Sequence, residues 1–187
     1  MQQTGLGPDE GDAVRARLQG LEVPTLTLPS TLGLIELRAF CAERVVLYVY
    51  PATGVPGRDP AIDPAPGWDD IPGAPGCTSQ SLGFKEAFER YVQYGLRVAG
   101  ISSQPLLEQR EFAARHAIPF PLLCDERLRL QQTWGLPAFT VGGRTFLKRM
   151  VLQVTANRIE RIMYPVTPPA ESAGAMLELL HPTEERS

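Results

Sequence analysis

The sequence contains little histidine and little cysteine, and this scarcity excludes several kinds of site. Its two histidines are His116 and His181, and its three cysteines are Cys41, Cys77 and Cys124. No Cys-x-x-Cys or His-x-x-x-His pair is present, so we expect no zinc or iron–sulfur site. An odd number of widely spaced cysteines also argues against a framework of structural disulfides.

Neither sign of charge dominates, and no hydrophobic run is long. The chain has 18 Lys and Arg against 21 Asp and Glu, a net charge of −3. The basic residues are scattered, which argues against a nucleic acid or an anionic membrane as partner. The longest apolar run, residues 45–49, is too short to cross a bilayer. Residues 1–10 lack the apolar core of a secretory signal, so we expect a cytoplasmic protein.

Proline and glycine, by contrast, are concentrated in one segment. Pro51–Gly76 holds 7 prolines and 5 glycines in 26 residues, so we expect no regular structure there. With 187 residues, the chain has the size of one domain. We predict an N-terminal extension with a short helix over residues 1–20, a main domain over 21–181 and a C-terminal tail over 182–187.

Strand-like and helical segments alternate along the main domain. Arg44–Tyr50 is rich in β-branched and aromatic residues without alternation, as in a central strand covered on both faces. Gly142-Gly143 resembles a turn between strands. The predicted strands are 26–28, 44–50, 96–102, 121–124, 144–155 and 158–164, and the predicted helices are 12–21, 34–42, one beginning at Cys77, 106–116, 126–134 (capped by Asp125) and 171–180. This order predicts an α/β fold with a central mixed β-sheet flanked by helices.

Cys77 begins an amphipathic helix directly after the Pro/Gly-rich segment. Phe84, Phe88 and Tyr91 follow it at helical spacing. We therefore expect Cys77 in the first helical turn, where free backbone N–H groups and the helix dipole favour an anion. A thiol placed there has a lowered pKa and a larger share of nucleophilic thiolate. Since ligands bind beyond the carboxyl ends of the strands in such sheets, Cys77 is predicted at that crevice as the nucleophile of a thiol-based enzyme.

Three segments, in matching order, resemble the peroxiredoxins of the AhpC/TSA superfamily, in the branch of peroxiredoxin Q and bacterioferritin-comigratory protein. Val45–Pro51 resembles the family's strand that ends in Tyr-Pro, and Pro75-Gly76-Cys77-Thr78 matches its Pro-Gly-Cys-Thr motif. Phe120–Glu126 resembles its Phe-Pro-Leu-Leu-Ser-Asp segment. The resemblance covers about residues 21 to 180. It implies a thioredoxin-like fold with a long Pro/Gly-rich insertion before the active-site helix.

The resemblance also implies a chemistry. The family reduces hydrogen peroxide or organic hydroperoxides without a metal or organic cofactor. On this reading Cys77 is the peroxidatic residue that becomes a sulfenic acid, and Pro51, Gly76 and the Thr78 N–H are substrate-binding. The implied partners are a hydroperoxide and an external thiol reductant, either thioredoxin, glutaredoxin or a low-molecular-weight thiol. A homodimer contact through the long loop is a further expectation.

The family places an arginine at the start of a strand, in an Arg-x-Thr-Phe-Leu pattern, to stabilise the developing charge. Two residues compete for this role. Arg144 matches the local motif better, but Arg149 begins the strand directly before the hairpin turn at residues 156–157. Because the distance to the hairpin fixes which end of the strand the residue reaches, we favour Arg149.

The chain departs from the family pattern at three positions. Ala74 stands where the pattern Pro-x-x-x-Thr-x-x-Cys has threonine, and Asp70 stands where it has proline; Thr53 is a candidate source of the missing hydroxyl. Many members of this branch carry a resolving cysteine five positions after the peroxidatic one, where this chain has Leu82. We favour a one-cysteine mechanism; Cys124 remains a candidate resolving residue, and a bridge between two chains is a third option.

Other readings of the same residues remain open. A redox sensor or binding protein with a thioredoxin fold and weak peroxidase turnover fits the loss of threonine at position 74. A disulfide oxidoreductase is disfavoured because Cys-x-x-Cys is absent. The segment 51–76 is either a flexible excursion or an ordered cover, which we favour, and Trp68 either covers the site or anchors the loop. Cys41 is expected to be a buried spectator.

Overall fold

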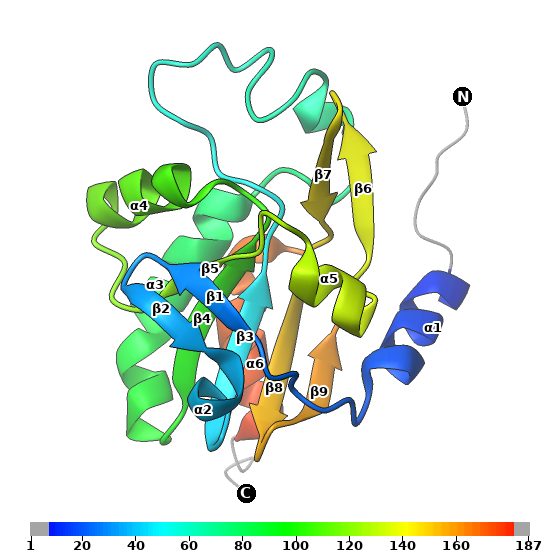
Figure 1. Ribbon diagram of the computed structural model, residues 1–187, viewed down its shortest axis with the longest axis vertical. Helices are drawn as coiled ribbons and strands as arrows, with labels where there is room; N and C mark the ends of the chain where they lie inside the picture. Colours follow the sequence, from blue (N-terminus) through cyan, green and yellow to red (C-terminus); the bar gives the residue numbers. More distant parts are fainter. Residues whose placement is uncertain (1–7, 182–187) are drawn as a thin grey trace, which may run out of the picture.

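A central sheet of seven strands organises the molecule, as the computed structural model of residues 8–181 shows (Figure 1). The strand order is β2-β1-β5-β4-β3-β8-β9, and β6 and β7 form a separate hairpin. The strands are β1 (Thr27–Ser30), β2 (Gly33–Glu36), β3 (Arg44–Val49), β4 (Arg97–Ser102), β5 (Leu122–Cys124), β6 (Ala138–Val141), β7 (Arg144–Leu147), β8 (Met150–Thr155) and β9 (Arg158–Met163). The helices are α1 (Pro8–Leu18), α2 (Leu37–Phe40), α3 (Cys77–Gln93), α4 (Leu106–Arg115), α5 (Arg129–Trp134) and α6 (Ser172–Leu180), with 3₁₀-helices η1 (Trp68–Asp70) and η2 (Pro169–Glu171).

The sheet is mixed. Strands β3, β4 and β5 run parallel, whereas β8 pairs antiparallel with β3, and β9 with β8. At the other edge, β1 pairs antiparallel with β5 and β2 with β1. With helices on both faces, this arrangement confirms the predicted α/β class and the thioredoxin-like fold.

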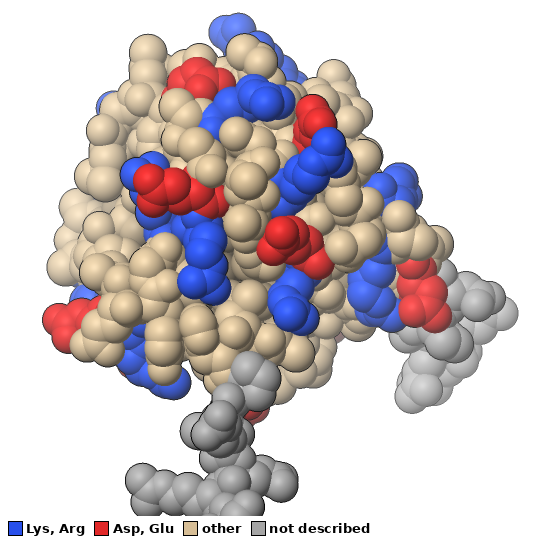
Figure 2. Space-filling view, turned by 90° about the horizontal axis from the view of Figure 1, so that it is seen from below, with Lys and Arg blue, Asp and Glu red and all other residues tan. Residues whose placement is uncertain are grey.

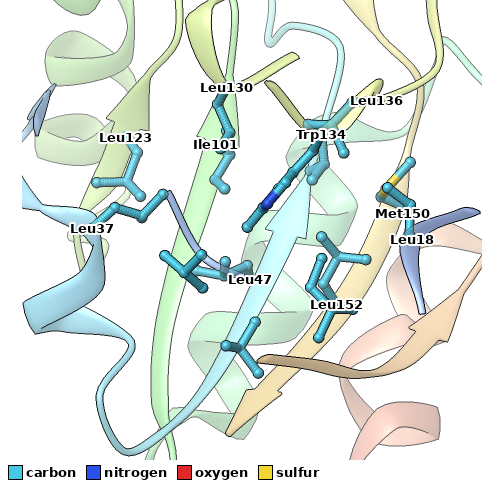
Figure 3. Packing of buried hydrophobic residues seen from close by; sticks show 14 of the residues in the cluster. Leu18, Leu37, Leu47, Ile101, Leu123, Leu130, Trp134, Leu136, Met150 and Leu152 are labelled. Atoms are coloured by element: carbon cyan, nitrogen blue, oxygen red, sulfur yellow. The ribbon is translucent and has the colours of Figure 1, made fainter. Parts of the chain in front are cut away.

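Strand β3 explains why both faces of the sheet are covered. Successive side chains of a strand point to opposite faces, and Val45–Tyr50 is buried throughout. Alternate residues 45, 47 and 49 join a hydrophobic cluster with α1, α2 and α5, part of which Figure 3 shows around Leu47 and Trp134. Residues 46, 48 and 50 join a second cluster with α3, α4 and α6. The continuous apolar run is therefore the consequence of burial on both sides.

The prediction of one continuous strand over 144–155 is wrong, because the structure divides this segment into β7 and β8. Strand β7 pairs with β6 across the glycine turn at 142–143, as the sequence predicted, and β8 belongs to the central sheet. Phe146 of β7 packs on Trp68 and Phe139 in a third cluster, away from the main sheet. Two residues, Lys148 and Arg149, separate the strands, and this break sets where the arginine lies.

Two predicted helices are shorter than expected. Residues 33–36 pair with β1 instead of beginning the helix 34–42, and the Glu36 carboxylate accepts hydrogen bonds from the N–H groups of Arg38 and Ala39 at the start of α2. Helix α5 begins at Arg129, not at residue 126. The Asp125 carboxylate nevertheless accepts from the N–H groups of Leu130 and Gln131, so it satisfies the helix start from a distance.

Helix α1 is joined to the same core, since Val14 and Leu18 lie in the cluster that contains β3. The division into an extension and a main domain remains a prediction; residues 1–7 of that extension and the predicted tail 182–187 lie outside the described residues. None of the helices in residues 8–181 has the length and apolar character needed to span a membrane. On the face seen in Figure 2, acidic and basic side chains are interspersed, in line with the scattered charges of the sequence.

Candidate active site

The register of the central sheet brings four chain segments to one edge. Strand β3 ends at Val49, whose partner across the antiparallel pairing is Met150, the first residue of β8. Arg149 therefore stands level with the exit of β3, where the long loop to Cys77 begins. The parallel strands β4 and β5 end at the same edge, with Ser102 opposite Cys124. The carboxyl ends of the parallel strands therefore meet here, where the strand order predicts a ligand site.

Cys77 is the first residue of α3, and Gly76 sets its position. Gly76 has φ of 98°, in the left-handed region that glycine adopts without strain. A Cβ built on it lies 2.8 Å from Cγ of Pro169 in η2, closer than packed atoms approach. The residue before the cysteine must therefore be glycine for two independent reasons, its backbone conformation and its contact with η2.

Arg149 points its guanidinium at Cys77. Its Nη2 donates to the Cys77 Sγ at 3.2 Å and also to the carbonyl oxygens of Ala74 at 3.0 Å and Pro75 at 2.9 Å. The Cys77 thiol donates to the same Ala74 carbonyl at 3.4 Å. Both residues are 3% exposed, so the pair lies out of water. The backbone before the helix thus fixes the plane of the guanidinium against the sulfur.

Gln80 is part of this arrangement, although the sequence analysis did not single it out. Its Oε1 accepts a hydrogen bond from Arg149 Nη1 at 2.5 Å, and its side chain is fully buried. Gln80 lies three residues after Cys77, on the same face of α3. That spacing, which puts a long polar side chain on the face that also carries Phe84, is the signal that marks it in the sequence.

The charge of Arg149 has no carboxylate partner among residues 8–181. Its Nε and the Nε2 of Gln80 are buried and also lack hydrogen-bond partners in that range. A buried cation without a carboxylate favours an anion beside it. In this structure the group in that place is the Cys77 sulfur.

The predicted lowering of the Cys77 pKa is not found in this structure. Burial raises the pKa of the thiol above its ordinary value, while the Arg149 guanidinium and the backbone N–H groups of Ala52 and Cys77 lower it. Burial is the larger effect because it removes water from the charged form. The helix start and the arginine therefore lower the pKa as expected, but the burial of the sulfur raises it by more.

The start of the long loop lies against the site. The Ala52 N–H lowers the pKa of the Cys77 thiol, and the buried Pro51 directs its carbonyl to the Ser102 hydroxyl, which donates to it at 2.8 Å. Thr53, the candidate source of the missing hydroxyl, instead donates to the Gln104 side-chain oxygen at 3.2 Å. Among the described residues, the hydrogen bonds of the Cys77 Sγ involve Arg149 and backbone groups.

The remaining sequence candidates take different positions. Thr78 follows Cys77 in the first turn of α3 with an exposed side chain. Arg144 lies at the start of β7, where it donates to the Pro64 carbonyl at 3.1 Å and stacks over Phe146. Cys124 ends β5, is 5% exposed, and its thiol donates to the Gln104 carbonyl at 3.4 Å.

All three cysteines are free thiols. Cys41 is fully buried in the cluster that contains β3, and burial raises its pKa to about 12, in keeping with the expected spectator role. Within residues 8–181, no group of three or more His, Cys, Asp or Glu side chains is arranged to hold a metal ion.

Comparison with known proteins places this site in a family. The sequence profile described as the AhpC/TSA family matches residues 71–151, which include Cys77 and Arg149. Peroxiredoxin Q of Oryza sativa subsp. japonica, a chloroplastic protein, is 29% identical over 147 residues, or 78% of this chain and 58% of that protein. The chloroplastic peroxiredoxin Q of Triticum aestivum is 31% identical over 125 residues, covering 66% and 49%. The chain thus spans about half the length of these curated relatives.

Solved structures share the fold. Peroxidoxin BcpB of Mycobacterium tuberculosis superimposes with a TM-score of 0.69 at 21% identity, covering 90% of this chain and 98% of that one. A PrxQ mutant of Xylella fastidiosa gives 0.68 at 19% identity, covering 87% and 94%. At these identities the likeness establishes the thioredoxin-type architecture.

Fold and site together define a thioredoxin-fold protein with a buried cysteine at a helix start and an arginine against its sulfur. The chain belongs to the AhpC/TSA family, and its relatives are peroxiredoxins of the Q type.

Proposed function

We propose that this protein is a thiol-dependent peroxidase that reduces hydrogen peroxide or organic hydroperoxides. The observation that carries the proposal is the 3.2 Å contact between Arg149 Nη2 and Cys77 Sγ, made by a buried cation without a carboxylate partner in residues 8–181. The name of the Q-type relatives, peroxiredoxin, supports the same reaction. Thiol and guanidinium supply the two groups that the reaction needs, a nucleophile and a charge at the reacting centre.

The proposed reaction begins with the Cys77 thiolate. The sulfur attacks one oxygen of the hydroperoxide, the O–O bond breaks, and Cys77 becomes a sulfenic acid. The second oxygen leaves as water or an alcohol after taking up one proton. Sulfur is oxidised by two electrons and the peroxide is reduced by two. Negative charge moves from the sulfur to the departing oxygen during this step, so a fixed cation that touches the sulfur stabilises both ends of the path.

Backbone donors complete the proposed site. The N–H groups at the start of α3, including that of Thr78, face outward from the helix terminus, where an oxygen anion is favoured. Gly76 permits the close approach of Pro169 to the start of the helix. Gln80 holds the guanidinium through Nη1, while Nη2 faces the sulfur and the carbonyls of Ala74 and Pro75.

We propose a one-cysteine cycle for recovery of the thiol. A first external thiol displaces water from the Cys77 sulfenic acid and forms a mixed disulfide, and a second thiol then releases the reduced enzyme and an external disulfide. Two features support this cycle over resolution within the chain. Position 82 is leucine, and Cys124 is held on β5 by the Gln104 carbonyl, on a different element from Cys77.

The function is tested by peroxide consumption with an external thiol as reductant, comparing the wild type with Cys77→Ser. Cys41→Ser serves as the matched control, since Cys41 is buried in a cluster on the other face of the sheet. We expect the first variant to lose all peroxide consumption above background and the second to retain it. Equal consumption by the wild type and Cys77→Ser removes the proposal.

A second function is favoured by one specific observation. Burial raises the Cys77 pKa and leaves the side chain 3% exposed, which suits a sensor that is oxidised slowly and does not cycle. Mass spectrometry of the protein after one equivalent of peroxide separates the two: a sensor accumulates oxidised Cys77 even with reductant thiol present, whereas a peroxidase returns to the thiol within one turnover.

A further inference from the structure

The long loop leaves the central sheet at Tyr50, just past the end of β3 (Figure 1). The Tyr50 N–H donates to the Ile101 carbonyl of β4 at 3.0 Å. Within residues 8–181, the three residues that follow, Pro51, Ala52 and Thr53, make no backbone–backbone hydrogen bond, although all three are buried. Buried backbone N–H and C=O groups need partners, so side chains have to supply them at this point of the chain.

The side chain of Gln104, which lies two residues past the end of β4, supplies most of these partners. Its Oε1 accepts from the Thr53 N–H at 3.0 Å and from the Thr53 hydroxyl at 3.2 Å, and its Nε2 donates to the Thr53 carbonyl at 2.7 Å. Nε2 also donates to the Glu108 carboxylate at 2.9 Å, so the amide uses both its donors and its acceptor. Bonded to both backbone groups of one residue, it acts on Thr53 as the peptide groups of a neighbouring strand do.

Gln104 is itself fixed by the groups around it. Its N–H donates to the Ser102 hydroxyl at 3.1 Å, and that hydroxyl donates to the Pro51 carbonyl at 2.8 Å. Its carbonyl accepts from Gln109 Nε2 at 2.8 Å and from the Cys124 thiol at 3.4 Å. Gln104 is 1% exposed and Gln109 is fully buried. A side chain locked in this way by packing and hydrogen bonds can hold a neighbouring segment in one geometry.

Ala52 lies between the two residues that are held, Pro51 and Thr53. It is 2% exposed and belongs to the same hydrophobic cluster as Ala74, whose carbonyl accepts from the Cys77 thiol. The Ala52 N–H lowers the pKa of that thiol, an effect that requires the N–H to lie near the sulfur and to favour its charged form. Because both neighbours of Ala52 are held, the direction of this N–H is held as well.

We propose that Gln104 is a positioning residue of the proposed active site, which aims the Ala52 N–H at the Cys77 sulfur by holding both backbone groups of Thr53. The proposal rests on the proposed function, in which this N–H stabilises the thiolate that attacks the hydroperoxide. Gln104 has no hydrogen bond to Cys77, so it acts through Ala52. A donor that is already aligned needs no reorganisation when the charge forms on the sulfur.

The test measures how fast a neutral alkylating reagent modifies Cys77 at one fixed pH near neutrality, by peptide mapping of the protein without peroxide. Gln104→Met keeps a side chain of similar length and removes its polar atoms. Because alkylation proceeds through the thiolate, loss of the aligned N–H should slow Cys77 labelling about tenfold, which corresponds to about one pKa unit. Gln104→Asn keeps an amide that is one methylene too short to bond on both sides, so it should slow labelling by less.

The sign of the change separates positioning from packing. If Gln104 only packs the start of the loop, its loss loosens this segment, exposes the sulfur and speeds the labelling of Cys77. If Gln104 aims a donor at the sulfur, its loss slows the labelling. Cys41, fully buried in a cluster on the other face of the sheet, reports unfolding and should stay unlabelled.

Two control variants test which hydrogen bonds matter. Thr53→Val removes only the 3.2 Å bond of the hydroxyl and leaves the two backbone bonds to Gln104, so Cys77 labelling should stay within about twofold of the wild type. Ser103→Ala removes a hydrogen bond from the neighbouring residue, whose hydroxyl donates to the Thr145 carbonyl of β7 at 2.9 Å, and should leave the labelling unchanged.

The proposal is overturned if Gln104→Met labels Cys77 as fast as the wild type or faster while Cys41 stays unlabelled, or if Thr53→Val slows labelling as much as Gln104→Met. If Gln104→Met unfolds and labels Cys41, Gln104→Asn decides: it has to slow Cys77 labelling with Cys41 unlabelled, and any other result overturns the proposal.

The proposed function fails separately from this proposal. If Gln104→Met slows the alkylation of Cys77 and the wild type consumes no peroxide, the positioning role stands and the peroxidase does not. If the wild type consumes peroxide and Gln104→Met labels Cys77 no more slowly, the peroxidase stands and the positioning role does not.

Discussion

The Nη2 of Arg149 lies 3.2 Å from the Sγ of Cys77, although 72 positions separate the two residues in the chain. The antiparallel pairing of β3 with β8 makes this contact, since Val49 and Met150 are register partners and Arg149 directly precedes Met150. The reactivity proposed for Cys77 therefore depends on the register of a sheet pairing as well as on the helix that carries it.

We expect Arg149→Gln to slow peroxide reduction by about 10²- to 10³-fold, the loss seen when one charge-stabilising donor is removed from an active site. The thiolate then loses its cation while its burial stays. Arg149→Lys keeps the positive charge but lacks the planar guanidinium, so its rate should lie between those of the wild type and Arg149→Gln. Stopped-flow measurement of peroxide reduction checks this.

Arg144→Gln is the matched control for the loss of an arginine, since Arg144 lies on β7 and contacts Pro64 and Phe146 instead of Cys77. Its peroxide reduction should not fall. An equal loss in Arg144→Gln and Arg149→Gln contradicts the role assigned to Arg149.

The arginine shows how far the sequence alone reaches. The spacing of Arg149 from the hairpin placed it at the end of the strand, because antiparallel pairing turns sequence distance into position along the sheet. What the sequence did not reveal is the break at residues 148–149. Arg144–Thr155 reads as one strand, and the division arises because Phe146 packs on Trp68 and Phe139 of other segments. Such long-range packing leaves no local pattern.

Cys77 shows the opposite limit. Its place at the start of a helix follows from local sequence, and the structure has it there. The direction of its pKa does not follow, since that depends on a loop whose folded path no periodicity predicts. Local effects at a helix start favour the thiolate, and the burial of the sulfur opposes them. The contact of Thr53 with Gln104 also depends on the folded path of the loop, so the sequence does not reveal it.

A pH profile of the reaction should show the effect of this burial. Because the pKa of Cys77 is raised above its ordinary value of 9.0, the thiolate is the minor form at neutral pH. Its share grows about tenfold for each pH unit below the pKa. We therefore expect the rate constant for peroxide reduction to rise steeply from about pH 7 to about pH 9. A rate that is level over this range indicates a thiolate already formed at neutral pH and contradicts the raised pKa.

Gly76→Ala should destabilise the protein and disturb Cys77. The positive φ costs about 1 to 2 kcal/mol for alanine, and the contact with Pro169 adds about 1 to 3 kcal/mol of overpacking. The control is Gly95→Ala, just past the C-terminal end of the same helix. Gly95 has φ of 68° and open space around its Cβ position, so it should show the first cost alone. Denaturant unfolding of both variants gives the difference, and equal losses exclude the Pro169 contact as a constraint.

Cys124→Ser distinguishes the two ways of recycling Cys77. In the one-cysteine cycle the Cys124 thiol takes no part, so the variant should reduce peroxide over many turnovers at the wild-type rate, within about twofold, when an external thiol is supplied. Serine is close to cysteine in size and still donates to the Gln104 carbonyl, which the thiol now contacts at 3.4 Å. A structural loss is therefore small.

Non-reducing mass spectrometry of the wild type after one equivalent of peroxide completes this test. A disulfide between Cys77 and Cys124 requires their Cα atoms to come within about 7 Å, so the start of α3, which carries Cys77, must unwind for a bridge to form. We expect Cys77 as a sulfenic acid or a mixed adduct with the added thiol, and Cys124 as a free thiol. If an internal disulfide is found and Cys124→Ser also loses turnover, Cys124 is the resolving residue and the cycle is a two-cysteine one.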